Sequence, residues 1–483
     1  MSRGDAEMTQ QVSVLVIGGG PAGITAALQA RQLGATVTLL EAEMAGGTSY
    51  NRGPAPVRTL ARAARLARDW SSWERFGLRG EPPQPDLPAM LSNSDRVARY
   101  AHDKKRISDY VRGQGIELLE HLGPVQFSDP HTVDGADGGQ WRADRIIIAV
   151  GGHPAALPVP GAELALSYND LRSLSALPAE VAVVGAADTG GQIASILTDL
   201  GVHVLLIEAG PKILPGADPS VSAELRRAFE ARGIVVRTGT RVTAVERAGA
   251  GFRVHSRPDA AGSDSVDTVD AVFVAVGWPA NIDNLHLDAA GVASSRGAIP
   301  VDGYLRTNVE HIYAAGDVNG IAKLVQTARL QGRIAARNAV EGASRAYCAD
   351  VVPSGSFTDP EYGRVGLTEP QAAESHDVVV GTALHADLLR PVSDGRPDGF
   401  CKMIADRHSH TVLGVHVIGE YAAETVQVAA TAMAAGLTVT QIAELQFAYP
   451  TFTEAVAMAA QKICRDLQIG DFPMMWSNLA EED

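Results

Sequence analysis

VSVLVIGGGPAG, residues 12–23, sets the architecture expected for this 483-residue chain. Its first half, 12–17, is apolar and β-branched, which is typical of a buried parallel strand. Gly18, Gly20 and Gly23 follow in the spacing G-x-G-x-x-G, where the strand should turn into a helix. In that setting the glycines permit a tight turn, let a pyrophosphate approach the backbone and let the helix pack close to the strand.

The residues around these glycines strengthen the signal. A helix is expected over about 22–33, ended by Gly34, and its N-terminus offers free N–H groups and a positive dipole end to phosphates. A second strand, 36–40, ends on Glu41, roughly where an acid accepts hydrogen bonds from a ribose. Strand, glycine turn, helix, strand and acid together predict a dinucleotide-binding unit.

A second unit of the same kind begins at residue 181. A strand over 181–184 runs into Gly185-Ala186-Ala187-Asp188-Thr189-Gly190, then a helix over 192–200, and a strand over 202–207 that ends on Glu208. Ala187 stands where the middle glycine is expected, and its methyl group would crowd a phosphate. The pattern therefore allows either a working dinucleotide site or a weakened one. Glu208 would bond a ribose hydroxyl and repel a 2′-phosphate, which favours NADH over NADPH, and nearby Lys212 could soften that preference.

Composition narrows the classes of partner and location. The net charge of −15 argues against nucleic acid and anionic membranes. No apolar run reaches the roughly 18 residues of a membrane helix, and the polar first ten residues do not resemble a signal peptide. Cys348, Cys401 and Cys464 are scattered, which fits a reducing cytoplasm and packing roles and matches neither a disulfide framework nor a metal motif.

Between the two units the sequence predicts loops, helices and a strand. The Gly- and Pro-rich segment 46–58 is expected to be a shaped loop and not a helix. Arg58, Arg62 and Arg65 should share one face of the helix that follows, the last two on a solvated basic face. Residues 81–88 read as an exposed linker, and 96–122 as one long helix with a possible break at Gly113 and Gly115. A buried strand over 145–150 follows.

The remaining chain supplies another strand end and a third region. Strands are expected at 272–276, closing at Gly277, and at 312–315, followed by Asp317 at a strand's C-terminal end, where α/β sheets bind ligands. Beyond a helix over 324–340, the composition changes to an α+β pattern from about residue 351. Strands are predicted at 399–404 and 411–419, and helices at 422–435 and 455–467, with Thr453 capping the last one. Residues 470–483 read as an acidic tail.

Two nucleotide units, the second inserted between the halves of the first, and an α+β region resemble the class I pyridine nucleotide-disulfide oxidoreductases. The resemblance spans about residues 12–467 and implies an α/β fold with two Rossmann-like domains, for FAD and NAD(P), and a C-terminal dimerisation domain. The implied boundaries are 1–155 and 280–350 for the FAD domain, 156–279 for the NAD(P) domain, 351–470 for the dimerisation domain and 471–483 for the tail.

The resemblance also implies which residues hold the cofactors, and it implies no metal. For FAD they are Gly18, Gly20, Pro21, Ala22, Gly23, Glu41, Gly47, Thr48, Arg58, Ala149, Gly151 and Asp317, the last on the ribityl chain. For the nicotinamide nucleotide they are Gly185, Gly190, Glu208 and Gly277. The last domain should form a homodimer that lends residues to the partner's active site.

Several departures from the family pattern bear on function. The family's redox loop reads G-G-T-C-x-N-x-G-C-x-P-S-K. In this chain Ser49 and Pro54 stand in place of its two cysteines, and neither residue can relay electrons as a disulfide does. The interfacial histidine is Tyr449, a poor base at neutral pH but a possible hydrogen-bond donor. The flavin-side lysine is Arg58 and its helix partner is Gln192, so the charge is kept but the ion pair is expected to be absent.

Two further replacements surround the nicotinamide and flavin sites. Asp188 stands where an aromatic or apolar residue often gates the nicotinamide, and Trp278 replaces the usual arginine after Gly277. The sequence thus predicts an FAD-dependent NAD(P)H oxidoreductase that passes electrons through flavin directly to a small acceptor such as a quinone. Arg58, Tyr449 and Glu454 would be the catalytic residues. The alternatives are a soluble pyridine nucleotide transhydrogenase and a flavin-binding dimer with little nicotinamide turnover.

Overall fold

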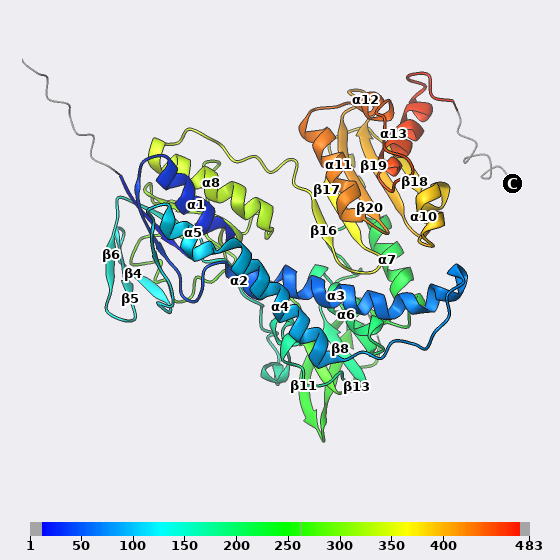
Figure 1. The fold of residues 1–483 in the computed structure, drawn as a ribbon, viewed down its shortest axis with the longest axis horizontal. Coiled ribbons are helices and arrows are strands. Elements are labelled where there is room, and N and C mark those ends of the chain that lie inside the picture. The colour runs from blue at the N-terminus through cyan, green and yellow to red at the C-terminus, as the bar shows by residue number, and fades with distance from the viewer. Residues whose placement is uncertain (1–11, 261, 474–483) are drawn as a thin grey trace, which may run out of the picture. The chain divides into compact units, whose positions relative to one another are not determined.

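The computed structural model describes residues 12–260 and 262–473, which fall into two compact units (Figure 1). Unit 1 comprises Met1–Val57, Ser92–Ala155 and Gly277–Cys348, and unit 2 comprises Arg58–Leu91, Ala156–Val276 and Ala349–Asp483. The second unit holds both the predicted NAD(P) region and the predicted dimerisation region. The domain boundaries drawn from the sequence therefore stay a prediction. The predicted tail lies largely outside the described residues.

A five-stranded parallel sheet forms the centre of unit 1, in the order β15-β7-β1-β2-β3. Val14 and Val16 face helices α1 and α8, which pack side by side on one face of the sheet, while Leu15 and Ile17 face the small antiparallel sheet β4-β5-β6. This alternation is the period of two that a strand imposes on its side chains. The strands are β1 (Ser13–Ile17), β2 (Thr36–Leu40), β3 (Glu117–Leu119), β4 (Val125–Asp129), β5 (Thr132–Gly135), β6 (Gln140–Arg142), β7 (Arg145–Ile148) and β15 (Ile312–Ala314); the helices are α1 (Pro21–Gln32) and α8 (Val325–Glu341).

Unit 2 contains a second parallel sheet, in the order β10-β9-β8-β14, beside a three-stranded antiparallel sheet, β11-β12-β13. The predicted strand–helix–strand of the second nucleotide unit is confirmed as β8, α6 and β9. Bounds are β8 (Glu180–Val184), α6 (Asp188–Asp199), β9 (His203–Ile207), α7 (Pro219–Ala231), β10 (Val235–Arg237), β11 (Thr240–Ala248), β12 (Gly251–Pro258), β13 (Ser265–Val269) and β14 (Ala271–Val274).

The last part of unit 2 is an antiparallel sheet in the order β16-β17-β20-β19-β18, with α11 and α13 packed against it. This confirms the α+β pattern predicted from residue 351. Bounds are β16 (Ser354–Ser356), β17 (Tyr362–Gly366), α9 (Glu369–Ala373), β18 (Val378–Leu384), α10 (Leu389–Ser393), β19 (Phe400–Asp406), β20 (Val412–Ile418), α11 (Ala422–Ala434), α12 (Val439–Ala443) and α13 (Glu454–Leu467). The 3-10 helices are η1 (Trp70–Phe76), η2 (Ala162–Leu164), η3 (Tyr168–Ser173), η4 (Asp317–Asn319) and η5 (His385–Asp387).

Two predictions between the nucleotide units were wrong. Segment 46–58 is not a loop, because it contains the short helix α2 (Gly47–Asn51) and the start of α3 (Pro54–Asp69). A proline fits the first turn of a helix, where its missing N–H leaves no bond unmade. The predicted long helix 96–122 is instead α4 (Leu87–Lys105) and α5 (Ile107–Gly113), separated by Arg106 in the left-handed conformation and followed by β3. The possible break at Gly113 is confirmed, because α5 ends there.

A buried lysine joins the two halves of unit 2. Lys402 Nζ on β19 lies 2.8 Å from Asp218 Oδ1, at the N-terminus of α7, and 2.5 Å from Glu369 Oε2. Asp218 is fully buried, and its hydrogen bonds from Lys402 and Ser220 outweigh burial and hold its pKa well below the usual range. The ion pair therefore ties the parallel and antiparallel sheets of this unit together.

Replacing Lys402 should destabilise unit 2 strongly. Lys402→Met leaves the Asp218 carboxylate buried without its counter-ion, and we expect a loss of about 3–5 kcal/mol in unfolding free energy. Arg407→Met is the matched control, because Arg407 pairs with Asp377 at the exposed end of the same hairpin. Urea unfolding of both variants checks this, and equal stability of the two would contradict it.

Candidate functional site

The first glycine turn of unit 1 is fixed by steric contact with the neighbouring strand. Gly18 has φ +103°, and a Cβ atom there would lie 2.5 Å from the carbonyl oxygen of Ala149, at the end of β7. A Cβ atom on Gly23 would lie 1.8 Å from the carbonyl oxygen of Gly18. Only glycine fits either position, so α1 starts directly at the carboxyl edge of the sheet.

Glu41 holds the turn from the other side. Its Oε2 accepts from the Gly19 backbone N–H at 2.6 Å, and its Oε1 accepts from the Glu43 N–H at 2.9 Å. Burial raises the pKa of Glu41, although both backbone donors favour the ionised form. The carboxylate thus lies at the strand end where the sequence placed it. Its bond to a ribose remains a prediction.

The N-terminus of α1 is open in the way a pyrophosphate requires. Gly20 is the N-cap, Pro21 occupies the first turn, and a Cβ atom on Gly20 would meet only the Gly47 Cα, at 3.9 Å. A helix N-terminus bare of side chains offers N–H groups and positive dipole to an anion. The cradle fits the diphosphate of a dinucleotide. The Ala22 side chain is buried and its backbone packs against Gly332 of α8, so only its backbone could contact FAD, and that contact stays a prediction.

Four further predicted FAD residues lie at the same edge of the sheet. Gly47, with φ +59°, packs on Gly20 so closely that a Cβ atom would lie 2.7 Å from its Cα, and Thr48 follows in α2. Gly151, with φ +67°, and Asp317 follow the ends of β7 and β15. Asp317 Oδ2 accepts a hydrogen bond from Trp278 Nε1 at 2.9 Å, and burial raises the pKa of Asp317.

The second nucleotide unit repeats this geometry in unit 2. Gly185 has φ +96°, and its Cβ would lie 2.5 Å from the carbonyl oxygen of Ala275, after β14. A Cβ on Gly190 would lie 1.7 Å from the Gly185 carbonyl oxygen. Glu208 accepts from the backbone N–H groups of Ala186 at 2.8 Å and Gly210 at 2.7 Å. These contacts match those of Gly18, Gly23 and Glu41 one for one.

Ala187 causes no strain at the middle position of this second motif. It is the N-cap of α6 with φ −78° and ψ −168°, nearly the φ −78° and ψ −174° of Gly20. That extended conformation suits any residue, so the substitution adds only a methyl group to the phosphate side. Asp188, the exposed first residue of α6, adds a negative charge there.

The ion pair between residues 58 and 192 is lost, as predicted, but Arg58 has another acidic partner that the sequence did not indicate. Its Nη1 lies 3.3 Å from Glu361 Oε1, and its guanidinium lies 4.2 Å from the ring centre of Phe357. Gln192 instead donates to Ser356 Oγ at 3.3 Å. Burial raises the pKa of Glu361 to about 7, opposed by the charges of Arg58 and Arg65. Sequence reasoning gave Glu361 no role, because its pairing spans 303 residues.

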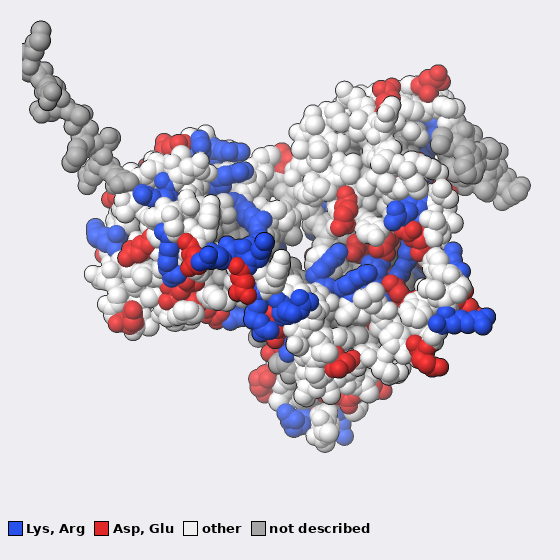
Figure 2. Space-filling view, in the orientation of Figure 1, with Lys and Arg blue, Asp and Glu red and all other residues white. Residues whose placement is uncertain are grey.

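A network of alternating charges surrounds this pair within unit 2. Asp359 is paired with Arg65, Arg68 and Arg396, and Arg65 also reaches Glu420. These cations hold the pKa of Asp359 below its usual value against the effect of burial. Arg65 is therefore not on a solvated face as predicted, whereas Arg62 is exposed. Figure 2 shows basic and acidic side chains interleaved over the region where Figure 1 places α3.

Tyr449 and Glu454 flank the start of α13. Tyr449 is 68% exposed, and Glu454, the first residue of the helix, is half-buried, which raises its pKa. Thr453 occupies the N-cap position but makes no side-chain cap, contrary to the prediction, because its hydroxyl pairs with that of Thr451 at 2.8 Å.

The three cysteines, all within the part of the chain that the structure describes, form no disulfide. Cys401 and Cys464 are buried in the antiparallel half of unit 2, and Cys348 is exposed. Ser49 donates to the Gly46 carbonyl oxygen at 3.2 Å, an ordinary loop contact. Within 12–260 and 262–473 there is no group of three metal-ligating side chains. Over the same ranges no helix is both long and apolar enough to cross a bilayer.

The raised pKa of Glu361 makes a prediction about stability. In the unfolded chain this carboxyl ionises near pH 4.5, and in the folded chain near pH 7. Between these pH values the folded chain therefore binds more protons than the unfolded chain. Its contribution to stability is therefore lost as pH rises through that window. As pH rises from 4.5 to 8, the free energy of unfolding of Glu361→Gln should increase relative to that of wild type by up to about 3 kcal/mol.

Thermal unfolding midpoints across this pH range measure the effect. Glu374→Gln, at an exposed position on the end of α9, is the control and should follow wild type throughout. Parallel curves for wild type and Glu361→Gln would show that Glu361 ionises normally.

Comparison with known proteins places this geometry in a family. The model of the pyridine nucleotide-disulphide oxidoreductases matches residues 12–332, and that of their dimerisation domain matches 352–460. Dihydrolipoyl dehydrogenase from Zymomonas mobilis is 32% identical, over 93% of this chain and 97% of its own length. Mercuric reductase from Lysinibacillus sphaericus is 31% identical, over 94% of this chain and 83% of its own.

Solved structures agree on the fold. LpdA from Mycobacterium tuberculosis superimposes with a TM-score of 0.83 at 27% identity, covering 93% of this chain and 99% of that one. The flavoprotein disulfide reductase RclA from Escherichia coli, at 24% identity, gives 0.82 over the same shares and supports the fold alone. The chain therefore belongs to the pyridine nucleotide-disulphide oxidoreductase family and is an enzyme that uses FAD and NAD(P)H.

Proposed function

We propose that this enzyme passes electrons from NAD(P)H through FAD directly to a small acceptor such as a quinone, without a redox disulfide. One observation carries the proposal. The loop that should hold two cysteines holds Ser49 and Pro54, and none of the chain's three cysteines, which all lie in the described residues, is in a disulfide. A disulfide relay needs two neighbouring thiols, one of them reactive as thiolate. Burial raises the pKa of Cys401 to about 12, which leaves that thiol inert.

The residues of unit 1 would hold the FAD. Backbone N–H groups at the N-terminus of α1 bind the diphosphate, Glu41 the ribose and Asp317 the ribityl chain. When bound, FAD supplies the capacity to take two electrons as hydride and to hand them on. The dihydrolipoyl dehydrogenase and mercuric reductase activities of the relatives are not carried over, because the chain lacks the paired cysteines of the family loop.

Arg58 is the proposed electrostatic residue. It follows the FAD loop in the chain, its guanidinium is about half exposed, and Glu361 and Phe357 hold it in place. A fixed cation stabilises negative charge that develops on a nearby ring system. Glu361 sets how much of that positive charge is neutralised. Because its pKa is near 7, the pair carries a net positive charge below that pH and becomes neutral above it.

The acceptor site is proposed to be completed by a second copy of the chain. The dimerisation domain supports a homodimer, and the strongly exposed Tyr449 hydroxyl can donate a hydrogen bond to a carbonyl oxygen of the acceptor. Glu454 would orient that acceptor from the first turn of α13. A cytoplasmic location stays the prediction from the scattered cysteines.

The donor is proposed to be NADH in preference to NADPH. Both Glu208 oxygens lie at the end of β9, where a carboxylate bonds ribose hydroxyls and repels a 2′-phosphate. Lys212 donates to the Ala217 carbonyl oxygen at 2.8 Å, which draws its charge away from Glu208. The unstrained backbone at Ala187 supports a working nicotinamide site over a flavin-binding dimer with little turnover.

Anaerobic mixing with NADH, followed by acceptors, tests the proposal. The flavin absorbance should bleach rapidly with NADH, and oxidised flavin should return on adding a benzoquinone. Return with oxidised thio-NADP but not with quinone would instead indicate a transhydrogenase. No bleaching with either NADH or NADPH would overturn both activities.

Arg58→Ala should retain FAD but slow its reduction by NADH at least tenfold, since one preorganised charge commonly contributes several kcal/mol to a transition state. Arg58→Lys should recover most of the rate. Stopped-flow absorbance measures the reduction. Arg62→Ala, an exposed arginine one turn along α3, should behave as wild type. An unchanged rate in Arg58→Ala removes Arg58 from the mechanism.

A further inference from the structure

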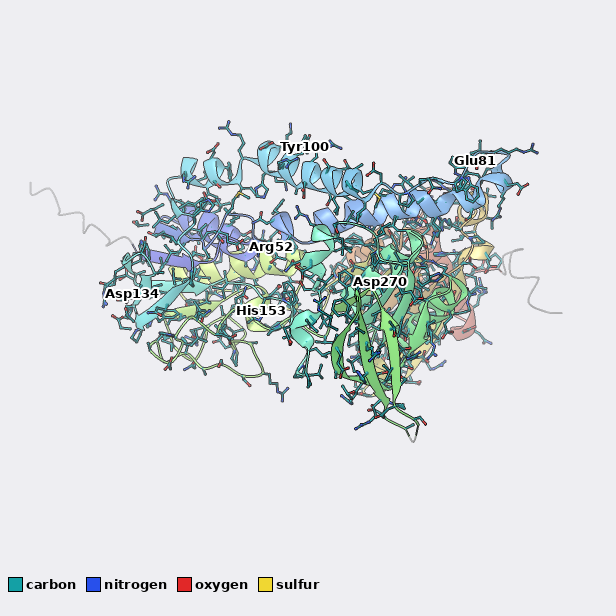
Figure 3. All side chains as sticks on the ribbon, turned by 90° about the horizontal axis from the view of Figure 1, so that it is seen from below. Arg52, Glu81, Tyr100, Asp134, His153 and Asp270 are labelled. Carbon is teal, nitrogen blue, oxygen red and sulfur yellow. The ribbon has the colours of Figure 1, made fainter. Side chains whose placement is uncertain are left out.

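The two segments that enter and leave the inserted region form a tight antiparallel ribbon in unit 1. Gly152 and Ala280 form a bridge, and the N–H groups of His153 and Ala155 each donate at 3.0 Å to the carbonyl oxygens of Pro279 and Gly277. His153, labelled in Figure 3, also pairs through Nδ1 with Asn281 Oδ1 at 2.8 Å. Trp278 lies on the returning segment of this ribbon.

The indole of Trp278 has a defined place because its neighbour is a glycine. A Cβ atom on Gly152 would lie 2.6 Å from Trp278 Nε1, 2.7 Å from its Cδ1 and 2.6 Å from the Pro279 carbonyl oxygen. Any larger residue at 152 would push the ring away. The half-buried indole is therefore held on one side by the backbone of the outgoing segment.

The indole N–H of Trp278 is directed at the carboxylate of Asp317, three residues after the end of β15. Trp278 Nε1 donates to Asp317 Oδ2 at 2.9 Å. An indole N–H is a donor only and does not titrate, so it orients the carboxylate and favours its ionised form at every pH. This bond opposes burial, which raises the pKa of Asp317. A carboxylate has room for several donors, so Asp317 can still accept from a ligand hydroxyl.

We propose that Trp278 is a positioning residue for FAD, which fixes the Asp317 carboxylate so that it can receive the ribityl hydroxyls. The inference rests on the proposed FAD role of Asp317. The ribbon would then do more than connect the inserted region to unit 1, because its returning segment would supply a side chain to the flavin site. A carboxylate that is already oriented as a hydrogen-bond acceptor need not lose side-chain freedom when FAD binds, which favours binding.

Titration of FAD into the deflavinated protein, followed by flavin fluorescence, tests the proposal without donor or acceptor. Trp278→Phe keeps an aromatic ring and removes the N–H donor. We expect its affinity for FAD to fall at least about tenfold, as for loss of a hydrogen bond to a charged group. Trp141→Phe, a half-buried tryptophan on β6 of the same unit, should bind as wild type.

A double-mutant cycle separates positioning from packing. In the Asp317→Ala background, the further change Trp278→Phe should alter FAD affinity less than twofold, because the carboxylate that the indole orients is gone. An equal loss in both backgrounds, or wild-type affinity of Trp278→Phe alone, would overturn the proposal. Wild-type affinity of Asp317→Ala would instead overturn the assignment of Asp317 on which it rests. These affinities are measured without an electron donor or acceptor, so a failed quinone assay would contradict the proposed function but would not change them.

Discussion

Steric exclusion of a side chain at the first glycine of each nucleotide motif is the constraint on which the molecule depends. Gly18 and Gly185 each leave less than 3 Å between a would-be Cβ and the carbonyl oxygen of the next strand, Ala149 or Ala275. The chain must therefore turn there with positive φ. As a result a helix N-terminus begins at the sheet edge, in the place where a pyrophosphate binds.

Arg58 follows a segment in which Ser49 and Pro54 stand where the resembled family carries cysteines, and a charge pair holds its guanidinium. Glu361, from the region before β17, supplies the carboxylate that Gln192 on α6 does not. The cation of Arg58 is thereby held by a residue of the antiparallel half of unit 2. Because burial raises the pKa of Glu361 to about 7, the net charge of the pair changes with pH near neutrality. A disulfide would respond to thiol redox chemistry instead.

The sequence predicted well what local rules determine. The bounds of β1, α1, β2, β8, α6 and β9 were predicted within a few residues from glycine spacing, β-branched runs and terminal acids. Each of these signals lies within one short stretch of consecutive residues. Sequence reasoning failed at 46–58, where glycine and proline looked like a loop but serve as helix starts. At 96–122 it predicted the break at Gly113 but missed the break at Arg106, which separates two helices without a glycine.

The parts of the site that sequence reasoning missed join distant residues. Glu361 lies 303 positions from Arg58, and Asp317 lies 39 from Trp278. No periodicity or motif encodes such pairs, because they depend on how the sheets pack. Trp278 and Gln192 stood out only as departures from a family pattern. That signal marked the positions correctly but could not name their partners.

The number of electrons the enzyme takes up tests the account most directly. In an anaerobic dithionite titration, a flavin without a sulfur relay should be fully reduced after two electrons per FAD, with no earlier long-wavelength band from a thiolate beside oxidised flavin. Uptake of four electrons per FAD, with such a band at the midpoint, would show a redox-active disulfide and contradict the account.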